Sequence, residues 1–537
     1  MDDTQTSQSR PASSTDEIEK IPGTPIARRD LLKIAGAGAI ATTMASLSTT
    51  AWMPRRVAAA TVATQFPDIQ FDLSSFVHPA TTVNGIQVQF GVTYTYMAPC
   101  TLSRTPGRAD QAILEGALQK IEATYPFSPS GVFTMVAYGV PYFSRFSSSL
   151  VASTIPRLAS NTSRFALEEA VPSPTDVSSA NPQISKRTFN VPVTIETNQV
   201  LFLLRSDNLN NITDVISWLQ GSNTLNGQAI ASPAFNNLLT FHTARINFVQ
   251  PGLPRQMANQ RGFPYASSIN PASSMFMGFV DQQVNASAPS AATVTFAGTN
   301  TARLTTARAG DYFDNGSVIH VAHTIMDLAQ FYENSSASQE DFSERIQYMF
   351  HSFKSDGTSG LLFPQDPNDG FTNGGGQGAP TGNLTTQQQS AFLPNIFFGT
   401  NKQTSNFDPG SLPTKVLRVG HTVGLQRSSR SSNGTPLHIR IDGPGISRLD
   451  VPDGSAQPTL EFAVFVPTTE FFRVMRVNSA SLDFVSKTDG GTATSVPAGV
   501  TPSAGEDDGL ERFLTATRRQ NWLIPPRRHR SFPLAEF

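Results

Sequence analysis

Cysteine is almost absent from this chain of 537 residues, which contains only Cys100. A single cysteine cannot form an intramolecular disulfide, and it cannot supply the paired thiolates of a zinc site or an iron–sulfur cluster. The fold must therefore be held together by its core. Because Cys100 ends an alternating segment, we expect it to be an inert strand residue.

Charge is also scarce. Charged residues make up 15% of the chain and the formal net charge is −2. No basic stripe interleaved with aromatic residues is present, so no nucleic-acid partner is expected. Hydrophobic residues make up 39% of the chain, which supports a folded protein. The length favours two domains of about 150–250 residues.

The N-terminus has the pattern of an export signal. A polar stretch precedes the pair Arg28 and Arg29, which leads into a weakly apolar Ala/Gly-rich run and an A-x-A site at residues 58–60. This predicts a twin-arginine signal over residues 1–60 and a mature protein in the periplasm or outside the cell. A membrane anchor is the alternative, but the Gly, Thr and Ser of the run argue against a stable one.

The order of predicted elements indicates an α+β fold. In the first half, apolar periodicity predicts a strand, a helix, two strands and a helix, which is the ferredoxin-like order. These segments are residues 86–97, 109–125, 131–140, 199–207 and 211–221.

The second half repeats this plan. Its predicted segments are residues 244–252, 316–333, 338–350, 459–467 and 468–478. We therefore expect two ferredoxin-like domains with antiparallel sheets and helices packed on them, over residues 61–235 and 236–537, with a boundary near residues 225–243. A polar, Gly-rich surface insertion is predicted near residues 352–410.

One carboxylate stands out in an apolar setting. Asp281 ends a Met/Phe-rich segment, where an ionised carboxylate is costly unless it is paired, hydrogen-bonded or used. A turn cap is the ordinary explanation. Further on, residues 415–445 contain His421, His438 and a high density of arginines, including Arg440, which strand or helix propensity does not explain.

Together these residues resemble the dye-decolorizing peroxidase family, whose members are haem enzymes built from two ferredoxin-like domains. The family signature is Gly-x-x-Asp-Gly on the distal side of the haem, then a proximal histidine, then an arginine that opens an Arg-x-Asn-like turn. Residues 278–281 match the first four positions of that signature, with Gly278 as its first glycine and Asp281 as its aspartate. Gln282 replaces its second glycine. The resemblance implies a fold of the dimeric α+β barrel type and a bound haem b.

The resemblance also implies roles for individual residues. His421 stands at the position of the axial ligand of the haem iron, with Arg440 at the arginine position and Asp442 in place of the asparagine. Gly278 and Asp442 would line the cofactor site. His438 is the rival axial ligand, although choosing it leaves no arginine at the expected distance downstream.

Two of these side chains would carry the chemistry. Asp281 would take a proton from peroxide and return it to the departing oxygen. Arg440 would stabilise the negative charge that develops as the O–O bond breaks.

The function that follows is an exported haem peroxidase that uses hydrogen peroxide to oxidise an unknown organic donor. The alternative is a catalytically degenerate secreted haem-binding or interaction protein on the same scaffold, which Gln282 and Asp442 favour. A serine hydrolase is not indicated, because no G-x-S-x-G elbow with a following Asp and His is present. Whether the chain forms a homo-oligomer stays open.

Two further features have ordinary structural interpretations. His320 and His323 lie three residues apart on an apolar segment, and we expect satisfied core residues there rather than metal ligands. The basic residues 518–532 are expected to form a solvated or docked terminus.

Overall fold

The computed structural model describes residues 66–76, 78–79, 81–83, 86–88, 91–182, 184–233, 235, 237–271, 273–277, 290–299, 304–333, 438–479 and 510–537. The predicted export signal, the predicted helix at 338–350 and the Gly-rich insertion lie outside these residues. No helix in the described part of the chain is both long enough and apolar enough to cross a membrane.

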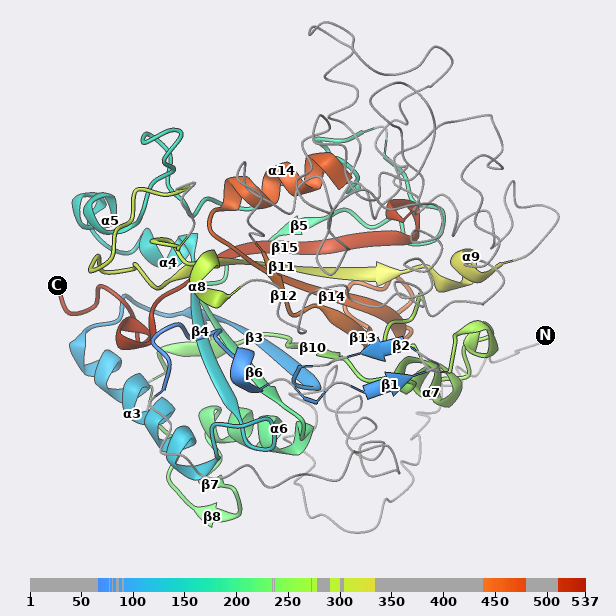
Figure 1. Cartoon of the computed structure of the whole chain (residues 1–537), viewed down its shortest axis with the longest axis horizontal. Helices are drawn as coiled ribbons and strands as arrows, with labels where there is room; N and C mark the ends of the chain where they lie inside the picture. The colour runs from blue at the N-terminus through green and yellow to red at the C-terminus, as the bar shows by residue number, and fades with distance from the viewer. Residues whose placement is uncertain are drawn as a thin grey trace, which may run out of the picture.

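The fold is α+β, and the described residues are organised around one sheet of 11 strands, which runs through the centre of Figure 1. Eight strands form its main path in the order β10-β3-β6-β4-β15-β11-β14-β12, and every neighbouring pair is antiparallel. Each half of this path has the strand order of a ferredoxin-like unit. The predicted fold class is therefore confirmed.

The first unit occupies β10-β3-β6-β4, in which the fourth, first, third and second strands of a βαββαβ chain lie side by side. Its elements are β3 (Tyr94–Leu102), α3 (Arg108–Thr124), β4 (Phe133–Gly139), β6 (Val200–Ser206), α6 (Leu209–Leu219) and β10 (Arg245–Phe248). Sequence periodicity alone groups β10 with the second half, but β10 pairs with β3. Both units share one sheet, so the sheet does not mark a separation between two domains. The boundary predicted near residues 225–243 therefore stays a prediction.

The second unit occupies β15-β11-β14-β12 and repeats the same order. Its elements are β11 (Ser317–Met326), α9 (Leu328–Tyr332), β12 (Ile439–Arg440), β13 (Gly443–Ser447), β14 (Gln457–Val466), α14 (Thr469–Ser479) and β15 (Leu514–Ile524). The last strand in sequence, β15, lies in the middle of the sheet beside β4 of the first unit.

Two short strands complete the sheet: β5 (Thr194–Ile195) pairs with β15, and β9 (Leu239–Phe241) pairs with β3. Outside the sheet, the described strands are β1 (Thr81–Val83), β2 (Ile86–Val88), β7 (Thr224–Leu225) and β8 (Gln228–Ala229), and the described helices are α4 (Val140–Phe143), α5 (Ser148–Thr154), α7 (Leu253–Gln260) and α8 (Ala291–Val294). Short 3-10 helices cover Ser74–Phe76, Ala266–Ser268, Glu511–Phe513 and Arg527–His529.

The two faces of the sheet bury different apolar residues, because successive strand side chains alternate between faces. The helix face carries Phe202 and Val464, which share a core with residues of α3, α6 and α14. The inner face carries Met97, Phe465 and Trp522, which form a second core.

The sheet stays open, which corrects the barrel closure implied by the family resemblance. The hydrogen-bonded path ends at β10 and β12. At the seam between β10 and β13, the Asn247 side-chain amide donates to the carbonyl oxygen of Ile441 at 3.0 Å.

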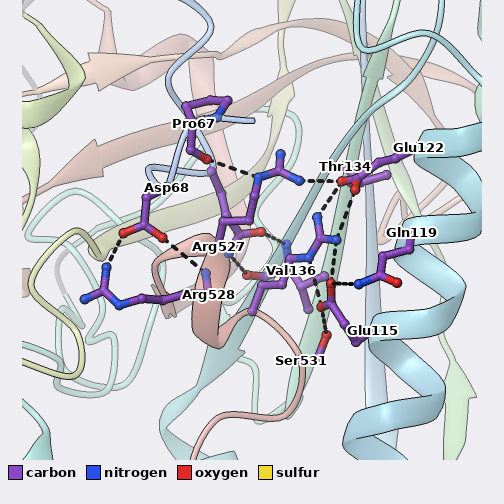
Figure 2. A network of polar contacts seen from close by, with 12 residues as sticks. Pro67, Asp68, Glu115, Gln119, Glu122, Thr134, Val136, Arg527, Arg528 and Ser531 are labelled. Carbon is purple, nitrogen blue, oxygen red and sulfur yellow. Dashed lines mark hydrogen bonds and ion pairs between the residues drawn. The ribbon is translucent and has the colours of Figure 1, made fainter. Parts of the chain in front are cut away.

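The C-terminal segment after β15 is bound to the first unit through buried ion pairs (Figure 2). Arg530 Nη2 lies 2.9 Å from Glu115 Oε1 on α3, and its Nη1 pairs with Glu122 of the same helix. Arg527 also pairs with Glu122. Arg530 and Glu122 are 3% and 5% exposed, so their pair is a core contact, whereas Glu115 is 35% exposed.

Two core tyrosines hold the same segment. The Tyr138 hydroxyl donates to the carbonyl oxygen of Arg530 at 2.7 Å, and the Phe532 amide donates back to that hydroxyl at 2.7 Å. The Tyr142 hydroxyl donates to the carbonyl oxygen of Pro533 at 2.8 Å. Of the predicted basic terminus, the residues after Ile524 are docked as one interpretation expected, whereas residues 518–524 form part of the central strand β15.

Candidate functional site

Two of the five predicted site residues, Arg440 and Asp442, are in the described part of the chain. Gly278, Asp281 and His421 lie outside the described residues.

The strand that carries Arg440 and Asp442 runs without a register shift from β12 into β13. Ile439 lies opposite Phe465, and Gly443 lies opposite Glu461. Between them the Ile441 amide continues the ladder with a hydrogen bond of 2.9 Å to a β14 carbonyl. Residues two apart along this strand therefore point to the same face.

Arg440 and Asp442 lie on the helix face at the edge of the second unit. Arg440 is opposite Val464, a residue of the helix-face core. The continuous register places Asp442 opposite Phe462, which packs against the same core. Both site residues are partly buried, and His438, two residues before Arg440, is only 2% exposed. An imidazole, a guanidinium and a carboxylate thus occupy five consecutive residues of one edge strand.

A row of side chains crosses the sheet from this edge. Arg440 is opposite Val464, Val464 is opposite His320, and His320 is opposite Asn521. Arg440 and His320 are two strands apart, a backbone separation of about 10 Å.

His320 is a neutral core histidine. Its Nδ1 lies 2.7 Å from Oδ1 of Asn521, and Arg519 Nη1 donates to its Nε2 at 3.3 Å. A guanidinium only donates, so Nε2 accepts and Nδ1 carries the proton. Burial, and then the charge of Arg519, lower the pKa of His320 well below its usual value. With both ring nitrogens occupied and Phe472 stacked on the ring at 3.7 Å, the core interpretation of His320 is confirmed.

His323 lies on the inner face and forms a buried pair with Glu461 that sequence analysis missed. Nδ1 of His323 lies 2.8 Å from Oε1 of Glu461, and Nε2 lies 3.2 Å from the carbonyl oxygen of Leu449. The carbonyl only accepts, so Nε2 is the donor in that hydrogen bond. Thr459 donates to the same carboxylate at 2.9 Å.

A sequence signal for this pair does exist. Glu461 is the only charged residue in the apolar strand segment 459–467, as Asp281 is in its own segment. The same reasoning about an isolated carboxylate would have singled it out.

A second set of charges links the two units on the sheet. Arg245 of β10 pairs with Glu196, and Arg518 of β15 bonds both Glu196 at 3.4 Å and Asp450 at 2.7 Å. Burial by itself would raise the pKa of Asp450, but hydrogen bonds from Arg518 and Thr517 outweigh it and hold this pKa below its usual value. This set, like the pair above, joins residues far apart in sequence.

Among the described residues, no group of three or more His, Cys, Asp or Glu side chains is arranged to hold a metal ion. Of the two histidines that the sequence analysis offers as axial ligand, the rival His438 is described and the preferred His421 lies outside the described residues.

Comparison with protein families gives one match. A model described as a family of unknown function, DUF7405, matches residues 94–359, which include β3 to α9. A search of curated proteins finds no match.

Among solved structures, the chain is similar to dye-decolorizing peroxidases. A putative DyP-type peroxidase from Shewanella oneidensis is 15% identical, with 81% of this chain and 93% of that chain covered and a TM-score of 0.39. The encapsulated DyP-type peroxidase from Mycobacterium smegmatis is 13% identical, with coverage of 81% and 93% and a TM-score of 0.40. A Rhodococcus jostii DypB variant in complex with heme is 12% identical, with coverage of 81% and 94% and a TM-score of 0.39.

Proposed function

We propose that this chain is an exported haem peroxidase that reduces hydrogen peroxide to water while oxidising an organic donor. The observation that carries the proposal is the placement of Arg440 and Asp442 on one face of one strand, at the edge of the second ferredoxin-like unit. The sequence resemblance assigns Arg440 and Asp442 to the haem site, where it expects a turn that the structure replaces by continuous strand, and it adds Gly278, Asp281 and His421 to the same site.

The chemistry of the side chains fits a haem. The described strand presents the buried imidazole of His438 and the partly buried cation Arg440, next to the apolar Val464 and Phe462. A neutral imidazole can serve as an axial donor, and an arginine stays protonated in a dry pocket. His421, or alternatively His438, would hold the iron, with Gly278 and Asp442 lining the cofactor.

Haem iron, when bound, supplies the redox chemistry with peroxide. In this proposal the carboxylate of Asp281 would accept a proton from the peroxide oxygen on the iron side and return it to the other oxygen, which departs. The guanidinium of Arg440 binds the departing oxygen and stabilises its negative charge. The apolar residues that precede Asp281 in the sequence would exclude water, which would otherwise compete with peroxide for these groups.

A second candidate function is a secreted haem-binding or interaction protein that has lost turnover. Gln282 in place of a glycine and Asp442 in place of an asparagine favour it, because an added carboxylate opposes the positive charge of Arg440.

An absorption spectrum of the purified chain after supplying haem tests the proposal. A strong Soret band that shifts when peroxide is added supports the enzyme. A stable Soret band that peroxide does not change would favour the second function. A protein that takes up no haem would overturn the enzyme and leave only an interaction protein on this scaffold.

The axial ligand and the export route can be tested separately. His421→Ala should abolish stoichiometric haem binding and leave the far-UV circular dichroism unchanged, whereas His438→Ala should keep the haem. The reverse pattern would move the ligand to His438. Replacing Arg28 and Arg29 by lysine should retain the precursor in the cytoplasm, and equal export of that variant would refute the signal.

A further inference from the structure

Asn247 connects the two ferredoxin-like units at the strand that carries the candidate site. It lies on β10 of the first unit and is 1% exposed. Its Nδ2 donates to the carbonyl oxygen of Ile441 at 3.0 Å and to that of Glu461 at 3.3 Å. Because both partners are carbonyl oxygens, the NH₂ group must face them, and this fixes the orientation of the amide.

The acceptor on the site strand has a special position. Ile441 is the residue between Arg440 and Asp442, so its carbonyl belongs to the peptide group that joins Ile441 to Asp442. A bond to this carbonyl from the neighbouring unit restrains the rotation of the strand about its own axis. That rotation sets the direction in which the two flanking side chains project.

Two glycines allow the units to approach this closely. A Cβ at position 445 would lie 2.6 Å from the carbonyl oxygen of Ile246, and a Cβ at position 443 would lie 3.2 Å from Cγ of Asn247. Either contact is too short for a side chain without movement of β10. The amide of Asn247 is therefore seated in a space that Gly443 and Gly445 leave open.

The second acceptor is restrained from its other end. The side chain of Glu461, whose backbone carbonyl receives the longer bond from Asn247, is paired with His323 of β11. Asn247 thus bonds both to the strand that carries Arg440 and Asp442 and to β14, which the pair of Glu461 and His323 holds to β11. Three strands, β10, β13 and β14, meet at one buried side-chain amide.

We propose that Asn247 is a positioning residue, which the first unit supplies to orient Arg440 and Asp442 on the second. This inference rests on the proposed function, which gives Arg440 and Asp442 their roles at the haem. Its structural part, the restraint of the strand at Ile441, is independent of haem.

Hydrogen exchange in the haem-free protein tests the restraint. Asn247→Leu has a similar side-chain volume and cannot donate. Losing both hydrogen bonds should accelerate exchange of the Ile441 amide by roughly 5- to 100-fold. The Val321 amide in the centre of β11 serves as an internal reference and should change little.

A matched control comes from Asn181, which also donates to two carbonyl oxygens, those of Ser173 at 2.7 Å and Asp176 at 3.1 Å, away from the site strand. Asn181→Leu should leave the Ile441 amide unchanged. If Asn247→Leu accelerates Ile441 no more than Asn181→Leu does, Asn247 does not restrain the strand and the proposal is overturned.

A double-mutant cycle in the haem-loaded protein tests the positioning role. Asn247→Leu should keep the haem and slow the reaction with peroxide about tenfold, and it should have no further effect when Arg440 is already leucine. A merely structural contribution would slow both backgrounds equally, and that result would overturn the role. If the wild-type chain binds no haem, the proposed function fails, and the exchange of Ile441 alone decides whether Asn247 restrains the strand.

Discussion

Nδ1 of His323 lies 2.8 Å from Oε1 of Glu461, and the two side chains are 0% and 1% exposed. They face each other across β11 and β14. Removing one partner of a buried ion pair leaves the other buried without its partner. This lowers the free energy of unfolding by more than the intact pair contributes to it. Glu461→Ala should therefore lower the free energy of unfolding by about 3–5 kcal/mol, measured by urea denaturation.

The matched control is the exposed pair of Arg473 and Glu470, since Arg473 is 51% exposed. Arg473→Ala should change the free energy of unfolding by about 0–1 kcal/mol. Equal losses in the two variants would show that the pair of His323 and Glu461 is not desolvated as the structure indicates.

His320 should make the protein sensitive to acid. Burial lowers the pKa of His320 well below its ordinary value of 6.5, so the unfolded chain binds a proton that the folded chain does not. The stabilising effect is complete above that value and is lost as the pH falls below it, at up to about 1.4 kcal/mol per pH unit. His320→Gln should remove this part of the slope between pH 6.5 and the lower pKa of the folded state. An unchanged slope in urea denaturation would mean that His320 titrates normally.

Gly445 should not tolerate a side chain. A Cβ there would lie 2.6 Å from the carbonyl oxygen of Ile246, so Gly445→Ala must displace β13 from β10 and should cost about 1–3 kcal/mol of unfolding free energy. Gly116 of α3 is the control, since nothing lies within 4 Å of its Cβ position. Gly116→Ala should stabilise the chain by about 0.5–1 kcal/mol. A neutral Gly445→Ala in thermal unfolding would show that the seam is looser than the structure has it.

The C-terminal segment should contribute to the stability of the first unit. Arg530 is 3% exposed and its partner Glu122 is 5% exposed. Arg530→Met removes the cation and leaves Glu122 with Arg527 and the Thr134 hydroxyl as partners. We expect a loss of about 3 kcal/mol in unfolding free energy, toward the lower end for a broken buried pair. A loss below that of the exposed Arg473→Ala would contradict the docked arrangement.

Asp281 separates proton transfer from haem binding. Asp281→Asn keeps the size of the side chain but cannot accept the peroxide proton, so haem should stay bound while the reaction with peroxide slows by ~10²–10⁴-fold. Arg440→Leu should slow the same step, and the two losses together should be less than additive, because both residues act on one bond-breaking event. Stopped-flow mixing with peroxide measures the rates, and an unchanged rate in Asp281→Asn would return this aspartate to a turn cap.

The amino-acid sequence by itself determined the local elements. Apolar periodicity predicted a helix at residues 109–125 and a strand at 459–467, and the structure has α3 at Arg108–Thr124 and β14 at Gln457–Val466. Both signals are local, since a helix or a strand repeats its apolar face within a few residues. The sequence also singled out Arg440 and Asp442 by resemblance, and strand alternation then places them on one face.

The tertiary structure alone decided which segments meet. Only the sheet assigns β10 to the first unit, places the last strand, β15, in the middle, and brings His323 to Glu461. Asn247 bonds to Ile441, which is 194 residues away in the sequence. Strand pairing depends on partners that are distant in sequence, whereas periodicity reports only which face of a segment is apolar. Asn247, the proposed positioning residue, could therefore be identified only from the tertiary structure, in which the two units lie side by side.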